Sequence, residues 1–281
     1  PFKNLFTQGM VCHESFKDKN GNWLYPEEVE KINSKKYVKK IDKSEVSVGA
    51  SESMSKSKKN TIDPESMINR YGADAVRLFI LSDSPPEKDI QWSNTGVAAA
   101  NKFLQKLWNL NYQILNRNKY SGDSEVEKIF NLEIDDFISK IDTSINDFRF
   151  NVSIALFHQT FNIFKNKLDK NIKNNIFKDE FVKFMKVLVP FTPHLAHECL
   201  NLLKCKTMEK WPKIKKDTIE NIKMAVQING KTRDIIDVKK NMSEKEIKEF
   251  ILKNSKAKSY IESDNISKII FVKNRIINYI I

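Results

Sequence analysis

Apolar residues recur at helical spacing along residues 95–212, and no other feature limits the fold of the chain as strongly. Apolar side chains three or four positions apart share one face of a helix, and that face has to pack against another element. The stripes are Val97, Phe103, Leu104, Leu107, Trp108, Ile114 and Leu115; Ile134, Phe137, Ile138, Ile141, Ile145 and Phe148; Ile154, Phe157, Phe161, Phe164 and Leu168; and Phe181, Phe184, Met185 and Leu188. A last helix is expected over about 194–204, after Pro190 and Pro193. The region therefore predicts a bundle of helices with these stripes as its core.

The first 93 residues differ from this pattern, because they combine short apolar stretches with turn residues. Phe16 and residues 23–25 flank Asp18-Lys19-Asn20-Gly21, which predicts a β-hairpin. Leu5 to Val11 is apolar and predicts a further strand.

A polar stretch and two helices are predicted after the hairpin. Residues 34–60 are rich in Lys and Ser and show no apolar periodicity, which indicates a mobile surface loop. Asp63 as N-cap and Pro64 as the first helical residue begin a helix that Tyr71-Gly72 ends. A second apolar helix is expected over residues 73–81.

The last part of the chain, residues 223–281, predicts a small α+β unit. Two hairpins and one helix are expected in it: Met224–Ile228 with Thr232–Val238 around the turn Asn229-Gly230, a helix from the capping box of Ser243 and Glu246 to about Asn254, and Ile269–Val272 with Ile276–Ile281. Asn-Gly is favoured in the two-residue turn between antiparallel strands, because both positions need a positive φ.

The chain carries a formal net charge of +12, from 48 Lys and Arg against 36 Asp and Glu. Half of this excess lies in residues 221–281, which hold thirteen Lys and Arg against seven Asp and Glu, a net of +6. The surplus favours a polyanion as partner, because Lys and Arg displace counterions from phosphates. The abundance of Lys, Asn and Ile along the whole chain leaves a drift in composition as the alternative explanation.

The three cysteines indicate the compartment. Cys12, Cys199 and Cys205 do not have the spacing of metal ligands, and an odd number does not favour a disulfide framework, so a reducing cytoplasm is expected. The sequence has no apolar run long enough to span a membrane, and its first residues do not have the pattern of a signal or transit peptide. Because the chain begins without Met and in a strand-like stretch, we expect it to be truncated at its N-terminus.

A Lys- and Ser-rich motif is the most informative stretch for function. Ser53-Met54-Ser55-Lys56-Ser57-Lys58-Lys59-Asn60 is followed by Asp63-Pro64, Tyr71-Gly72-Ala73-Asp74-Ala75-Val76-Arg77, Pro85-Pro86 and Trp92. A Lys/Ser run by itself is most often a solvated basic patch. Together with the residues after it, this stretch resembles the Lys-Met-Ser-Lys-Ser loop of class I aminoacyl-tRNA synthetases and the helices behind that loop. Its extension through Phe79, Gly96-Val97 and Trp108 looks most like the leucyl-tRNA synthetase family.

By this resemblance, Lys56 is the lysine that contacts the phosphates of ATP, and Met54 and Ser55 supply backbone contacts near the nucleotide. In the family's reaction the carboxylate of leucine attacks the α-phosphate of ATP, and an ammonium on a flexible loop stabilises the charge of the transition state. The family usually has Lys where this chain has Ser53, so one positive charge is missing; Lys58 and Lys59 are expected to compensate in part. ATP is expected as a substrate, with Mg²⁺ bound to it, and no metal site formed by the protein is expected.

The resemblance also implies a multidomain fold of the α/β plus all-α class. Residues 1–94 are expected to form the C-terminal part of a Rossmann-type catalytic domain, with the signature loop at 51–60. Residues 95–214 resemble the helical anticodon-binding domain, and residues 220–281 resemble the family's small α+β C-terminal domain, which binds tRNA. Within the latter, Val226 to Arg233 follow the pattern Val-Gln-x-Asn-Gly-Lys-x-Arg. Lys231 and Arg233 are the candidate contacts to RNA phosphates, and a favourable turn with a solvated flank is the alternative.

The implied function is the ATP-dependent ligation of leucine to tRNA-Leu by a monomer that is not bound to a membrane. The partner motif His-x-Gly-His and the editing domain are not represented in these residues, and His194-Leu195-Ala196-His197 lacks the Gly and is expected to be structural. The isolated chain is therefore expected to bind tRNA without activating leucine. Two alternatives remain open: a stand-alone tRNA-binding module without catalysis, and a different class I synthetase, of which the valyl enzyme is nearest.

Overall fold

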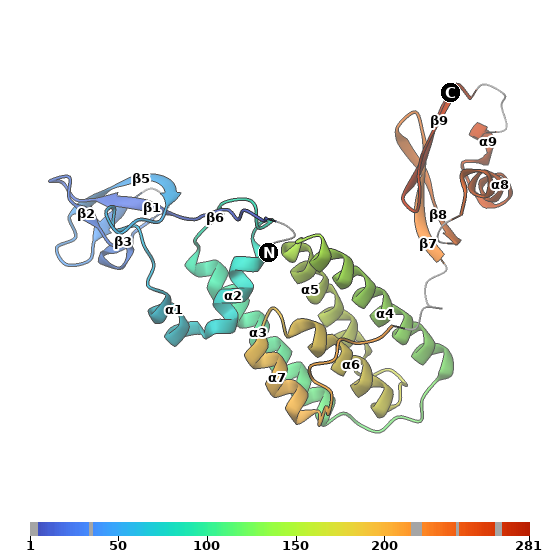
Figure 1. Cartoon of the computed structure of the whole chain (residues 1–281), viewed down its shortest axis with the longest axis horizontal. Helices are drawn as coiled ribbons and strands as arrows, with labels where there is room; N and C mark the ends of the chain where they lie inside the picture. Colours follow the sequence, from blue (N-terminus) through green and yellow to red (C-terminus); the bar gives the residue numbers. More distant parts are fainter. Residues whose placement is uncertain (1–4, 34–35, 215–220, 240–241, 262–265) are drawn as a thin grey trace. The chain divides into compact units, whose positions relative to one another are not determined.

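The chain forms two compact units, Pro1–Lys213 and Ile214–Ile281 (Figure 1). The computed structural model describes residues 5–33, 36–214, 221–239, 242–261 and 266–281. The expected strand Leu5–Val11 and the expected loop 34–60 are therefore described except for residues 34 and 35, whereas the expected boundary between 214 and 220 lies outside the described residues. None of the helices in the described part of the chain is long and apolar enough to cross a lipid bilayer.

A small sheet begins the first unit. Its strands are β1 (Val11–Lys17), β2 (Trp23–Leu24), β3 (Val29–Lys31), β4 (Tyr37–Lys39), β5 (Glu45–Ser53) and β6 (Ile90–Gln91), and a short 3₁₀ turn, η1 (Pro26–Glu28), precedes β3. The strand order is β2-β1-β5-β4-β3 with antiparallel neighbours, and β6 pairs with β1 in parallel. Phe16, Leu24, Val29 and Val46 form the core under these strands.

The predicted hairpin is confirmed, whereas the predicted strand before it is wrong. Phe16 lies opposite Leu24 in the hairpin, and the carboxylate of Asp18 accepts hydrogen bonds from the backbone of the turn. Residues 5–10 have no regular structure, and the strand begins at Val11. Leu5 is 89% exposed, so its apolar side chain does not belong to the core of a sheet.

The prediction of a mobile loop over residues 34–60 is wrong for residues 37–39 and 45–53, which form strands. β4 and the nine-residue strand β5 occupy much of this stretch, and Val38 and Val46 are buried. β5 forms because its backbone pairs with β1 and β4, and such pairing leaves little trace in the local sequence. The irregular segment that carries the motif therefore begins only after Ser53, the last residue of β5.

Two short helices connect the sheet to the bundle, as predicted. α1 (Pro64–Tyr71) begins at Asp63, whose carboxylate accepts hydrogen bonds from the N–H groups of Glu65 and Ser66, and α2 (Ala73–Ser82) follows directly. Gly72 between them has a φ of 85°, a conformation that glycine adopts at little cost.

The predicted bundle of helices is confirmed. It comprises α3 (Asn94–Leu115), α4 (Ser124–Asn146), α5 (Phe150–Lys167), α6 (Asn174–Leu188) and α7 (Pro193–Leu202). Its centre is a cluster of fully buried phenylalanine rings: Phe130, Phe157, Phe164, Phe177, Phe181 and Phe184. Trp108 and Phe148 are exceptions among the expected core residues, since they are 41% and 47% exposed. Phe148 lies beyond the end of α4 and stacks on Phe6.

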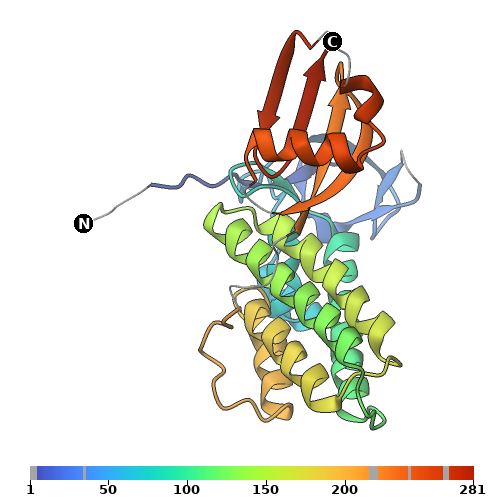
Figure 2. The same cartoon turned by 90° about the vertical axis from the view of Figure 1, so that its right-hand side faces the viewer.

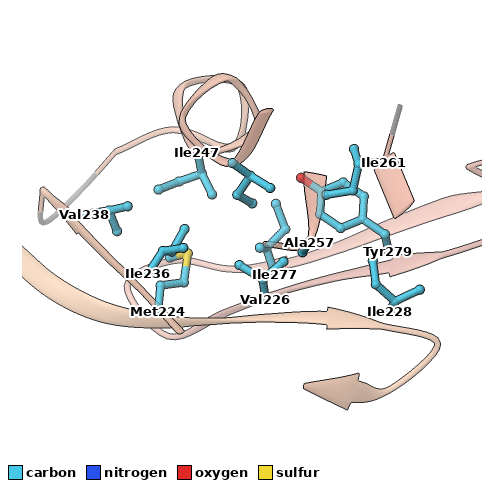
Figure 3. Packing of buried hydrophobic residues seen from close by; sticks show 11 residues of the cluster. Met224, Val226, Ile228, Ile236, Val238, Ile247, Ala257, Ile261, Ile277 and Tyr279 are labelled. Carbon is cyan, nitrogen blue, oxygen red and sulfur yellow. The ribbon is translucent and has the colours of Figure 1, made fainter. Parts of the chain in front are cut away.

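The second unit is a four-stranded sheet with helices on one face (Figure 2). Its elements are β7 (Asn221–Ile228), β8 (Lys231–Lys239), α8 (Glu244–Asn254), α9 (Lys258–Ile261), β9 (Lys268–Val272) and β10 (Ile276–Ile280). The order is β8-β7-β10-β9, in which β7 and β10 are parallel. Figure 3 shows the core between sheet and helices, to which α8 contributes Ile247 and the strands contribute Val226 and Ile277.

Both predicted hairpins and the capping box of this unit are confirmed. Asn229 and Gly230 have φ values of 49° and 78°, as a two-residue turn of this kind requires. Ser243 and Glu246 bond to each other's backbone N–H at the start of α8. The parallel pairing of β7 with β10 and the short helix α9 have no signal in the sequence pattern.

Candidate functional site

The motif forms a tight turn between β5 and α1. Its first residue, Ser53, ends β5 opposite Cys12 of β1, and the N–H of Met54 donates to the carbonyl of Val11 over 3.1 Å. The N–H of Lys59 then points back to the carbonyl of Lys56 at 3.3 Å. The turn therefore projects from the end of a paired strand, whose register fixes where it starts.

A buried asparagine holds the two ends of the turn together. The side chain of Asn60 is 0% exposed, and its Oδ1 accepts a hydrogen bond from the N–H of Ser55 over 2.8 Å. Its Nδ2 lies 3.2 Å from the carbonyl of His13, 3.3 Å from that of Glu52 and 3.4 Å from that of Ser53. Reasoning from the sequence missed this residue, because an Asn after a run of lysines has the appearance of a solvated surface residue.

Lys56 differs from the other lysines of the turn in its lack of a side-chain contact. Its side chain is exposed and makes no side-chain hydrogen bond or ion pair with any residue that the structure describes. Lys58 forms an ion pair with Glu52, and the ammonium of Lys59 lies 5.2 Å from the centre of the Tyr25 ring. The hydrogen bond from Lys58 lowers the pKa of Glu52, which keeps that carboxylate ionised.

This arrangement bears on the positive charge that is missing at Ser53. Compensation by Lys58 and Lys59 would require both ammonium groups to leave the partners they have here, Glu52 and Tyr25. Lys56 could thus bind an anion without first breaking a contact with another described residue.

Met54 and Ser55 have limited freedom to contact a nucleotide through their N–H groups. The N–H of Met54 is bonded to Val11, and that of Ser55 is bonded to Asn60. The hydroxyl of Ser55 lies 2.7 Å from that of Ser57. Contacts of these residues with a ligand would therefore use a carbonyl or a side chain.

The histidine pair of α7 lies at a helix start that another helix holds in place. The carboxylate of Asp74 in α2 accepts hydrogen bonds from the N–H of His194 over 3.3 Å and of Leu195 over 2.7 Å. Arg77, one turn further along α2, donates to the carbonyls of Pro190 and Phe191. Within the described ranges no group of three or more His, Cys, Asp or Glu side chains could hold a metal ion.

The two candidate RNA contacts lie at the start of β8. Lys231 is opposite Ile228 beside the turn, and its side chain is exposed. Arg233 sits at an irregularity of the ladder, where Thr232 faces Gln227 and Asp234 faces Val226. Its guanidinium lies 5.2 Å from the centre of the Tyr260 ring, so the charge stays at the surface while the side chain is held by an aromatic face.

Comparisons with known proteins define the class. Residues 32–93 match the family described as tRNA synthetases class I (I, L, M and V), and residues 127–249 match the anticodon-binding domain of tRNA ligase. The chain is 37% identical over 288 residues to the leucine–tRNA ligase of Orientia tsutsugamushi and 38% identical over 287 residues to that of Rickettsia massiliae. Each alignment covers 100% of this chain and 34% of the relative, so the chain spans about a third of the length of the curated relatives it matches.

A solved structure gives the same result. The agnB2 LeuRS of Agrobacterium radiobacter K84, in a ternary complex with tRNA and LeuAMS, superposes with a TM-score of 0.70 at 25% identity, over 100% of this chain and 33% of that one. The chain belongs to the class I tRNA synthetases. Within that class it belongs to the leucine–tRNA ligase family, since its similarity to ligases of that name extends over its whole length. The expected fold class, α/β plus a helical bundle, is confirmed.

Proposed function

We propose that residues 1–281 serve a leucine–tRNA ligase, in which the turn at 54–59 helps to activate leucine with ATP and the following parts hold tRNA-Leu. The observation that carries this proposal is the exposed ammonium of Lys56, which meets no counter-charge among the described residues and stands on a turn anchored at both ends. The similarity of the whole chain to a third of the leucine–tRNA ligases favours leucine over valine as the amino acid.

In the first step of this reaction, a carboxylate oxygen of leucine bonds to the α-phosphorus of ATP, and the bond to pyrophosphate breaks. Negative charge grows on the phosphate oxygens as this happens, and an ammonium placed beside them stabilises the transition state more than the ground state. Lys56 can supply this charge, because Lys is a compact cation on a long stem. Mg²⁺ would accompany ATP through its phosphates, with Met54 and Ser55 near the nucleotide.

The similarity to leucine–tRNA ligases also supports a division of the chain into three functional parts. Residues 1–94 belong to the catalytic domain, 95–214 to the anticodon-binding domain and 220–281 to a tRNA-binding domain. The net charge of +6 over residues 221–281 supports the last assignment, because RNA backbones attract lysine and arginine. The three cysteines are free thiols, which suits a reducing cytoplasm.

The test of Lys56 uses a complete ligase, namely the Rickettsia massiliae relative with residues 1–281 in place of the segment they match. Lys56→Ala should lower leucine-dependent pyrophosphate exchange about a hundredfold, equivalent to a loss of about 2.7 kcal/mol of transition-state stabilisation. Lys58→Ala is the matched control and should cost much less, because Lys58 is occupied by Glu52. Unchanged exchange in Lys56→Ala would refute the catalytic assignment.

A stand-alone tRNA-binding module is the second candidate, and the basic second unit favours it. The 281-residue chain by itself should bind tRNA but form no leucyl-adenylate, because it spans only a third of the relatives. If the ligase carrying these residues is inactive although it folds and binds tRNA, the module becomes the better explanation.

A further inference from the structure

Asn60 is a polar residue in a fully buried place, and this requires an explanation. A buried carboxamide is costly unless its donors and acceptor find partners. Here Oδ1 accepts from Ser55, and Nδ2 faces the carbonyls of His13, Glu52 and Ser53. Every one of these partners is a backbone group. The side chain therefore forms, at the base of the turn, the kind of hydrogen bonds that a neighbouring strand would otherwise form.

Asn60 follows residues 54–59, and its partners precede these residues or lie among them. Glu52 and Ser53 end β5, His13 lies on the neighbouring strand β1, and Ser55 is inside the turn. The ion pair of Lys58 with Glu52 and the contact of Lys59 with the Tyr25 ring each hold only a lysine side chain, whereas Asn60 bonds to the backbone. Asn60 is therefore the side chain that fixes the path of the backbone at the base of the turn.

We propose that Asn60 is a positioning residue that sets the direction in which Lys56 leaves the sheet. This inference rests on the proposed role of Lys56, since Asn60 itself, with no exposed surface, acts only through the turn. Because four backbone groups from two strands and the turn converge on one side chain, a change of that side chain alters the path of residues 54–59 as a whole. A small displacement of a group that stabilises a transition state is enough to lower the rate strongly.

The experiment uses the complete ligase that carries residues 1–281. Asn60→Asp keeps the acceptor for Ser55 but places an oxygen against three carbonyls, and Asn60→Ala removes all four interactions without adding charge. Each should lower the kcat of leucine-dependent pyrophosphate exchange about ten- to hundredfold and leave the KM for leucine unchanged. Glu52→Gln weakens the contacts of the carboxylate with Lys58 and Ser15 but keeps the backbone carbonyl that faces Asn60, so it is the neighbouring control and should have little effect.

A double-mutant cycle separates positioning from a general loss of structure. In the Lys56→Ala background, either Asn60 variant should cause little further loss, because the group that Asn60 positions is already gone. If the two losses multiply, Asn60 does not act through Lys56 and the proposal is overturned. Unfolding of both Asn60 variants, followed by tryptophan fluorescence, would also overturn it, because the residue would then serve the fold as a whole. A Lys56→Ala variant with full activity refutes the proposed function instead, whatever the Asn60 variants do.

Discussion

At residue 9 the chain has no room for a side chain. A Cβ on Gly9 would lie 2.1 Å from the carbonyl oxygen of Lys88, far inside van der Waals contact, and the N–H of Gly9 bonds to the carbonyl of Pro86 over 2.8 Å. The segment before β1 therefore touches the segment before β6 through backbone atoms. This contact helps to place β1. The carbonyl of Val11, the first residue of β1, also accepts a hydrogen bond from the N–H of Met54, the first residue after β5.

Gly9→Ala should lower the free energy of unfolding of the first unit by about 1–3 kcal/mol, because one backbone has to move away from the other. Urea unfolding can be followed by tryptophan fluorescence, since all four tryptophans lie within residues 1–213. Gly21→Ala is the matched control: it has a φ of 81° but nothing within 4 Å, so it should carry only a conformational cost of about 1 kcal/mol. A neutral Gly9→Ala would contradict the close approach.

Lys56 and Asn60 show how far single residues can be predicted from the sequence. The role proposed for Lys56 follows from its place in a motif, which needs no knowledge of the fold. The role of Asn60 depends on strands β1 and β5 lying side by side, and His13 is 47 positions away in the chain. No local pattern indicates such a pairing, so the anchor of the turn becomes visible only in the structure.

Helices α4 and α6 share a buried group of charges. Lys183 donates to Asp135 over 3.2 Å and to Glu180 over 2.8 Å, and the two carboxylates are 3% and 5% exposed. Two acids in the interior of a bundle are tolerated because one ammonium lies between them. Although desolvation works in the opposite direction, the hydrogen bond and attraction of Glu180 raise the pKa of Lys183, so this lysine stays charged.

Lys183→Met should destabilise the first unit by about 3–5 kcal/mol, because both carboxylates lose their counter-charge in a poorly solvated place. Urea unfolding with tryptophan fluorescence measures the change. Lys128→Met, an exposed position on α4, should alter stability by about 0.5 kcal/mol or less. Similar effects of the two substitutions would mean that the charges are better solvated than their burial indicates.

The same cluster predicts a dependence on pH. Burial raises the pKa of Glu180 above its ordinary value of 4.5, and this outweighs the hydrogen bond from Lys183. The folded state keeps a proton that the unfolded chain has released, so the contribution of Glu180 to stability is complete below about pH 4.5 and is lost as the pH rises through the raised pKa. Glu180→Gln does not titrate. Its stability relative to the unsubstituted chain should therefore increase from about pH 4 to about pH 7 in urea unfolding, and a constant difference would contradict the raised pKa.

Elements with a local signal are predictable from the sequence, and elements that depend on distant partners are not. The bundle helices follow from apolar spacing, and caps such as Asp63 and Ser243 mark where other helices begin. Strand β5 has the sequence pattern of a loop, because Glu45–Ser53 is polar at most positions and its pairing partners lie elsewhere. The same reason explains the parallel contact of β7 with β10.

The basic second unit is the part of the molecule from which tRNA affinity is expected. Lys231→Ala and Arg233→Ala should each weaken binding of tRNA by the 281-residue chain and reduce the slope of log affinity against log salt by about one for each phosphate that is no longer neutralised. Filter binding or fluorescence anisotropy at several salt concentrations gives both quantities. Lys245→Ala, exposed on α8, is the control. An equal loss in that variant would point to diffuse attraction, and an affinity that does not respond to salt would exclude phosphate contacts.

The position of β10 has a consequence for how the second unit is made. This strand lies between β7 and β9 in the sheet. When a ribosome has reached residue 272, both neighbouring strands have been synthesised, but the strand that pairs with both of them has not. Ile277 and Tyr279 are also still missing from the interior at that moment. A message cut short before the codons for β10 would therefore yield a complete helical bundle followed by a sheet with a gap in its middle. Such a chain would expose its apolar residues to cellular proteases and be removed.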